Sequence, residues 1–118
     1  MTAVVTAAID SYHAHVYFDA ATRDAAWALR ERLPSVFPGA EIGRFHERPV
    51  GPHPRWSFQI AFAPDLFDRV VPWLMLHREG LTVFLHPNTG DAYTDHADRA
   101  VWMGELLPLN LEALRGGG

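Results

Sequence analysis

The chain has 118 residues, of which 48% are hydrophobic and 20% charged, and these values are typical of one soluble globular domain. It contains no cysteine, which excludes disulfides, thiolate catalysis and sulfur-ligated zinc or iron–sulfur sites. The net charge of -4 and the scattered basic residues argue against nucleic-acid binding. We expect a single domain over residues 1–118, with flexible ends at 1–10 and 116–118.

We expect neither a membrane span nor an export signal in this chain. No apolar stretch approaches the roughly 20 residues that a membrane span requires. Residues 1–8 are apolar but lack the basic start of a signal peptide. We therefore predict a cytoplasmic protein with no membrane partner.

The first predicted strand covers residues 11–18 and alternates between two sets of side chains. One face carries His13, His15 and Tyr17, and the other carries apolar residues. Asp19 is expected to cap a helix over residues 20–33, which Pro34 would end.

The later elements follow in chain order. They are an edge strand at 41–47, a proline-rich turn at 48–54, a strand at 55–62, a helix at 64–78, a strand at 81–86, a polar loop at 87–98 and an apolar tail at 100–107. Pro72 lies inside the second helix, so we expect a kink or two short helices there. The order predicts an α+β fold, a ferredoxin-like βαββαβ sandwich. Its four-stranded antiparallel sheet would carry two helices on one face, plus the C-terminal tail, with the first and third strands central and parallel to each other.

Five of the seven histidines are expected to meet at one end of the sheet face that the helices leave uncovered. These are His13, His15, His46, His53 and His86. A lone H-x-H pair on a strand is more often a surface feature, but the convergence of several such residues favours a shared metal or catalytic site. His77 would end the second helix and is assigned no function.

The uncovered face also carries aromatic side chains. Tyr17 and Phe84 would stack on an aromatic substrate or be buried by another layer. An uncovered apolar face rarely stays exposed, so either the tail or a second subunit should cover it. A second subunit in that position would make the protein a homodimer.

Several segments together resemble the DOPA 4,5-dioxygenase family, small ring-cleaving dioxygenases of fungi and bacteria. They are Tyr12-His13-Ala14-His15-Val16-Tyr17-Phe18, Arg48-Pro49-Val50-Gly51-Pro52-His53-Pro54, Phe58-Gln59-Ile60-Ala61-Phe62, His86-Pro87-Asn88-Thr89-Gly90-Asp91, Asp95-His96 and Trp102-Met103-Gly104. The resemblance implies a mononuclear non-haem Fe(II) enzyme, often dimeric. It would open the ring of a catechol such as DOPA with O2 and give a muconic semialdehyde.

The residues suit that chemistry. An iron that binds both a catecholate and dioxygen needs about three protein ligands and open positions. The nearby carboxylates, Glu47, Asp91 and Asp95, do not lie on the predicted open face, so we favour a three-histidine metal site. Its expected ligands are His15, His53 and His86.

The remaining candidate residues would handle protons and substrate. His13 would be a fourth ligand or an acid/base, with His96 in reserve for the second role. The expected substrate-binding residues are Tyr17, Arg48, Gln59 and Phe84, with Arg44 as a second arginine for a substrate carboxylate.

Two other functions stay open from the sequence. Imidazole ligands accept zinc or another divalent metal readily, so a non-oxidative metal enzyme would use the same site. Ferredoxin-like domains also serve as ligand-binding or regulatory modules without ring-cleaving activity, which the fold alone does not exclude.

Overall fold

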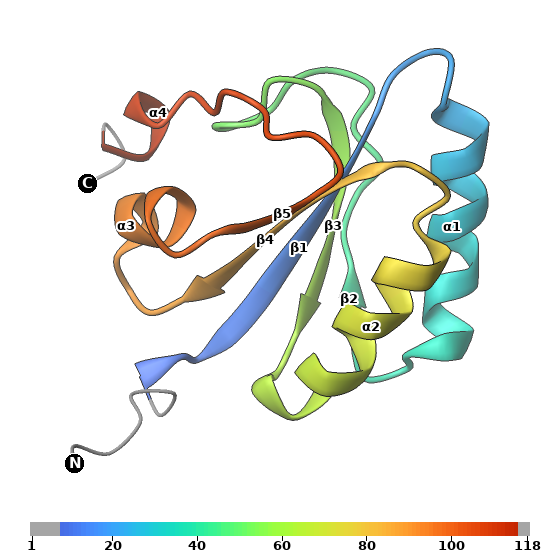
Figure 1. Ribbon diagram of the computed structural model, residues 1–118, viewed down its shortest axis with the longest axis horizontal. Coiled ribbons are helices and arrows are strands. Elements are labelled where there is room, and N and C mark those ends of the chain that lie inside the picture. The colour runs from blue at the N-terminus through green and yellow to red at the C-terminus, as the bar shows by residue number, and fades with distance from the viewer. Residues whose placement is uncertain (1–7, 116–118) are drawn as a thin grey trace.

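The computed structural model describes residues 8–115 (Figure 1). Its elements are β1 (Ser11–Phe18), α1 (Arg23–Val36), β2 (Glu41–Ile42), β3 (Trp56–Phe62), the 3-10 helix η2 (Pro64–Leu66), α2 (Phe67–His77), β4 (Thr82–Asn88), α3 (Ala92–Ala97), β5 (Val101–Met103) and α4 (Glu112–Arg115). The expected flexibility of 1–7 and 116–118 lies outside the described residues. Asp10 is tied to the sheet, because its N–H donates to the Asn88 carbonyl at 2.9 Å.

One open antiparallel sheet of five strands forms the centre of the fold, in the order β2-β3-β1-β4-β5. Helices α1 and α2 lie on one side of it, and α3, α4 and the C-terminal segment lie on the other (Figure 1). The predicted α+β class is confirmed, and β5 adds a strand to the four that were expected. Among residues 8–115, no helix is long and apolar enough to cross a bilayer.

The expected parallel pairing of the first and third strands is wrong. Tyr12 pairs with Phe62 and Phe18 with Trp56, so β1 and β3 are antiparallel. The helical crossover from β1 to β2 leaves these two strands pointing the same way, and the chain then reverses into β3. Because β3 lies between them in the sheet, it must run against both.

The alternation read from the sequence divides the sheet faces as predicted. Ala14, Val16 and Phe18 of β1 point to the helices, where they join Val83 and Leu85 of β4 in the main core. The alternate residues of the same strands point to the other face, because successive side chains of a strand lie on opposite sides.

The first helix is displaced by about one turn from its predicted bounds. Asp19 accepts bonds from the N–H groups of Ala21 and Thr22, so it caps the turn before α1 and not the helix itself. Pro34 lies inside the last turn of α1 and does not end it. A proline loses only one helical bond, and this close to the C-terminus little helix remains to be disrupted.

The second helix divides earlier than predicted. The break falls at Leu66, between the 3-10 turn and α2, and α2 continues through Pro72. Pro72 and Asp68 are exposed, so water can satisfy the Asp68 carbonyl that lacks an N–H partner at position 72.

The second strand is shorter than predicted. Its ladder stops at Ile42 and returns only as an isolated bridge between His46 and Ser57. The intervening chain places Phe45 against Phe18, with ring centroids 4.2 Å apart, so core packing replaces the regular ladder.

The predicted polar loop after the fourth strand contains a helix, α3. Asp91 is its N-cap, and the carboxylate accepts from the Thr94 N–H at 3.2 Å and from its hydroxyl at 2.7 Å. The tail then adds β5, and Leu107 packs on Tyr17 and Phe84. Of the two covers expected for this face, the tail is the one that the structure shows.

Candidate metal centre on the open sheet face

Three histidines from two neighbouring strands form the centre of the site. His13 and His15 lie two residues apart on β1, and His86 lies opposite His13 on β4. Their ligating nitrogens all lie within 4.8 Å of one another, and the Nε2 atoms of His15 and His86 are 3.0 Å apart. This grouping of imidazoles is a donor set that fits a divalent transition metal.

A backbone carbonyl sets the tautomer of His86. Its Nδ1 lies 2.9 Å from the carbonyl oxygen of Pro87, and a carbonyl only accepts. Nδ1 therefore carries the proton, and Nε2 presents a lone pair toward His15. A backbone carbonyl on the second ring nitrogen is the usual support of a metal-binding histidine.

Burial keeps the clustered histidines neutral. It lowers the pKa of His15 well below the ordinary value of 6.5, with repulsion from neighbouring histidines as a further cause. Burial likewise lowers the pKa values of His53 and His86 to about 4, and it lowers the pKa values of His13 and His96. Neutral imidazole is the form that binds metal, so the site is ready for an ion at neutral pH.

His53 lies close to the site, but not for the reason that the sequence predicted. Because β1 and β3 are antiparallel, the start of β3 lies beside the end of β1, far from His13. The turn before β3 nevertheless places the His53 ring 4.2 Å from that of His15. The Tyr17 hydroxyl lies 2.5 Å from His53 Nδ1, and burial raises the pKa of Tyr17, so its O–H stays protonated and donates.

Helix α3 brings His96 over the other side of the cluster. Its ring centroid lies 3.9 Å from that of His86 and 6.4 Å from that of His15. His96 Nδ1 is 2.7 Å from the Ala92 carbonyl oxygen, so Nδ1 carries the proton here as well. The sequence pattern that signals this helix is Asp91 followed three residues later by Thr94, which forms a cap.

Two predicted substrate-binding residues form the floor of the site. Tyr17 is 1% and Phe84 0% exposed, and both pack against Leu107 of the tail. The Phe84 ring lies between 5.5 and 5.8 Å from those of His15, His86 and His96. They therefore support the histidines directly, while their contact with a substrate stays a prediction.

The other predicted residues lie outside the cluster of His13, His15 and His86. Gln59 is partly buried and pairs with His15 across the sheet, and Arg48 is exposed in the turn. His46 lies at the level of Ser57, nearer His53 than His13. His77 packs on Trp73 in the last turn of α2, as its assignment to a helix end predicted.

The three nearby carboxylates are engaged elsewhere. Glu47 pairs with Arg23, and Asp91 caps α3. Asp95 accepts from Thr89 and Arg99. Among the described residues, the group that could hold a metal ion consists of His13, His15 and His86, and His53, which was expected as a ligand, is not part of it.

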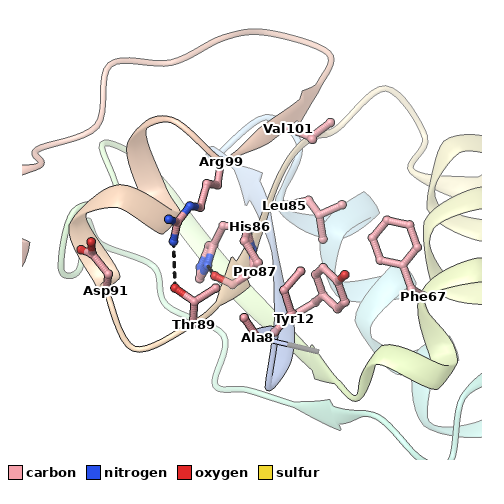
Figure 2. Close-up of a pocket in the computed structure, with 11 residues that line it drawn as sticks. Ala8, Tyr12, Phe67, Leu85, His86, Pro87, Thr89, Asp91, Arg99 and Val101 are labelled. Carbon is pink, nitrogen blue, oxygen red and sulfur yellow. Dashed lines mark hydrogen bonds between the residues drawn. The ribbon is translucent and has the colours of Figure 1, made fainter. Parts of the chain in front are cut away.

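A cavity of about 890 Å³ opens beside His86, at the edge of β4 beyond the end of β5 (Figure 2). Its wall is mostly apolar and includes Tyr12, Phe67 and Leu85, which belong to the helix side of the sheet. Arg99, bonded to Thr89, borders its polar end (Figure 2). The cavity touches the histidine cluster only through His86.

Known proteins match nearly the whole chain. It is 37% identical over 116 residues to an uncharacterized 21.2 kDa protein of Botryotinia fuckeliana, an alignment that covers 89% of this chain and 63% of that protein. It is 34% identical over 119 residues to the DOPA 4,5-dioxygenase of Amanita muscaria, covering 94% of this chain and 52% of that enzyme. The chain thus spans less than two thirds of the length of either relative.

A solved structure matches more completely. The crystal structure of a protein from Nostoc punctiforme, described as a "putative dioxygenase", superposes with a TM-score of 0.94 at 51% identity, covering 98% of this chain and all of that one. The family model for the Dopa 4,5-dioxygenase family matches residues 12–113. The chain therefore belongs to the Dopa 4,5-dioxygenase family.

Proposed function

We propose that this protein is an extradiol dioxygenase that opens the ring of a catechol such as DOPA with Fe(II) and O2. Both oxygen atoms enter the product, a muconic semialdehyde, as the carbon–carbon bond beside the hydroxyls breaks. The observation that carries the proposal is the cluster of His13, His15 and His86, whose ligating nitrogens lie within 4.8 Å of one another. Family membership supplies the reaction class.

The geometry of the histidines fits one metal ion. Metal–imidazole bonds are about 2.0–2.1 Å long, so two nitrogens bound at a right angle are about 3 Å apart. The Nε2 atoms of His15 and His86 are 3.0 Å apart. His53 is the candidate for a further ligand, since its ring already lies against that of His15.

Bound iron(II) would supply the redox centre at which a catecholate and dioxygen react. Side chains near the metal would accept and return the protons of the reaction. His96 presents an unprotonated Nε2, because its Nδ1 is held by the Ala92 carbonyl. We propose that His96 Nε2, or the half-buried His13, takes the proton of a catechol hydroxyl and later returns it.

The remaining groups would position the substrate and exclude water. Phe84 and Tyr17, covered by the tail, give the histidines a dry floor. Gln59 pairs with His15 across the sheet, and we propose that Arg48, exposed in the turn before His53, would bind a substrate carboxylate. We also propose that β1 to β4 with α1 and α2 form a ferredoxin-like unit, and that the protein acts as a cytoplasmic homodimer.

The test is oxygen uptake after anaerobic loading with iron(II). Wild-type protein and the control His77→Gln should consume O2 with DOPA or another catechol and form a yellow semialdehyde, whereas His86→Gln should not. A panel of catechols that gives neither colour nor oxygen uptake with iron-loaded wild-type protein would rule the proposal out. Stoichiometric zinc binding without such activity would instead indicate a non-oxidative metal protein on the same fold.

A further inference from the structure

A buried carboxylate joins helix α3 to the end of β4 beside the histidine cluster. Asp95 is 1% exposed and is the buried residue of this six-residue helix. Burying a carboxylate costs free energy unless hydrogen-bond donors surround it. The donors that Asp95 binds therefore indicate which segments it joins.

Both carboxylate oxygens of Asp95 accept hydrogen bonds. Oδ2 accepts from the Thr89 N–H at 2.8 Å and from its hydroxyl at 3.1 Å. Oδ1 accepts from the same hydroxyl at 2.9 Å and from Arg99 Nη1 at 3.0 Å. Arg99 Nη1 closes the network by donating to the Thr89 hydroxyl at 2.9 Å (Figure 2).

This network joins the two segments that carry neighbouring imidazoles. Thr89 follows β4, the strand of His86, and Asp95 directly precedes His96 on α3. The two rings lie 3.9 Å apart, yet no hydrogen bond joins them among the described contacts; the carbonyls of Pro87 and Ala92 hold their Nδ1 atoms instead. The distance between the rings therefore depends on how α3 is fixed to β4.

We propose that Asp95 is the positioning residue that holds His96 over His86, through its bonds to Thr89 and Arg99. The carboxylate acts through His96 and does not itself touch metal or substrate. Only the kinetic part of this inference rests on the proposed dioxygenase function; the positioning is a property of the protein without any reaction.

The first test is nuclear magnetic resonance of the histidine rings in the full, 15N-labelled chain without iron. Wild-type protein should show His96 as the Nδ1–H tautomer, with a ring-to-ring Overhauser contact to His86. In Asp95→Asn one carboxylate oxygen is replaced by an NH2 group. This group must face either the Thr89 N–H or Arg99 Nη1, and neither of these can accept a hydrogen bond. That contact should then be lost, and His96 should average toward the tautomer mixture of a free histidine.

Two further variants test whether the effect is specific to the bonds of Asp95. Asp98→Asn removes a charge from the exposed C-cap of the same helix and should leave the His96 signals unchanged. Thr89→Val removes one donor but keeps the backbone N–H, so it should weaken the contact even if Asp95→Asn fails to fold. An unchanged His96 in both Asp95→Asn and Thr89→Val would overturn the proposal, as would an equal change in Asp98→Asn.

The kinetic test uses a double-mutant cycle with iron-loaded protein. A positioned acid or base contributes about 100-fold to 10,000-fold to the rate, so Asp95→Asn should lower kcat/KM by at least about tenfold. If Asp95 acts through His96, the double variant Asp95→Asn/His96→Gln should be within about twofold of His96→Gln alone. Fully additive losses would contradict the positioning role. An inactive wild-type protein would contradict the proposed function and leave the ring measurements to decide this inference.

Discussion

His15 and His86 place their Nε2 atoms 3.0 Å apart across the neighbouring strands β1 and β4. Without an ion, His15 must donate its Nε2 proton to His86, whose Nδ1 already donates to the Pro87 carbonyl. With an ion, both Nε2 lone pairs would turn to the metal and the His15 proton would move to Nδ1. Metal binding at this pair should therefore release or relocate a proton.

Removal of one of these imidazoles should abolish tight metal binding. Loss of a supporting residue around a metal site already costs 10-fold to 100-fold in affinity, so His86→Gln should weaken zinc or cobalt(II) binding by more than about 100-fold. Titration calorimetry on chelator-treated protein measures this, with His77→Gln as the control that should keep wild-type affinity. Equal weakening in both variants would show that the metal binds elsewhere.

Tyr17→Phe should destabilise the fold through His53. The substitution removes the hydroxyl 2.5 Å from His53 Nδ1 and leaves that buried nitrogen without its partner. An unsatisfied buried polar group costs about 1–3 kcal/mol, and that loss is expected in urea unfolding. Tyr12→Phe on the same strand is the control, because Tyr12 packs on Phe62 and Phe67 through its ring. A loss no larger than that of Tyr12→Phe would argue against the bond.

The metal-free protein should lose stability as the pH falls from about 6.5 to about 4. Unfolded histidines titrate near 6.5, whereas burial lowers the pKa values of His53 and His86 to about 4 in the folded state. The unfolded chain then binds more protons over this window, so the contribution of these two histidines to the free energy of unfolding decreases as the pH falls and levels off below 4. Above pH 6.5 these two histidines do not change the dependence of the free energy of unfolding on pH.

Urea titrations between pH 8 and pH 4 measure this dependence. Carboxylates titrate at the lower end of the range, so the comparison is with His86→Gln. This variant should show a shallower slope between pH 6.5 and 5, where few carboxylates change charge. The same slope in both proteins would mean that His86 is not held neutral by burial.

Phe84→Ala should remove the floor of the site. Phe84 is fully buried between the histidines and the tail, and it packs on Trp102 with ring centroids 4.5 Å apart. Truncation of a buried phenylalanine costs about 3–5 kcal/mol in unfolding free energy. Leu106→Ala, at a residue 79% exposed, should stay within about 0.5 kcal/mol of wild type. A small loss in Phe84→Ala would mean that the tail does not pack on this face in solution.

The histidine cluster was predictable where it depends on strand alternation. Period two puts His13 and His15 on one face whatever the partner strands, and the pairing of β1 with β4 adds His86. The place of His53 was predicted for the wrong reason. Strand direction put the start of β3 beside Tyr17, and the fold of the proline-rich turn then brought the His53 ring to His15.

The sequence by itself determined which side chains share a face and that no cysteine thiolate takes part, because both follow from local spacing and composition. Only the tertiary structure decided that α3 lays His96 on His86, that Asp95 is buried and bonded to Thr89 and Arg99, and that the tail covers Phe84. These contacts join segments whose relative placement no short-range pattern encodes. They depend on the packing of α3 and the tail against a completed sheet.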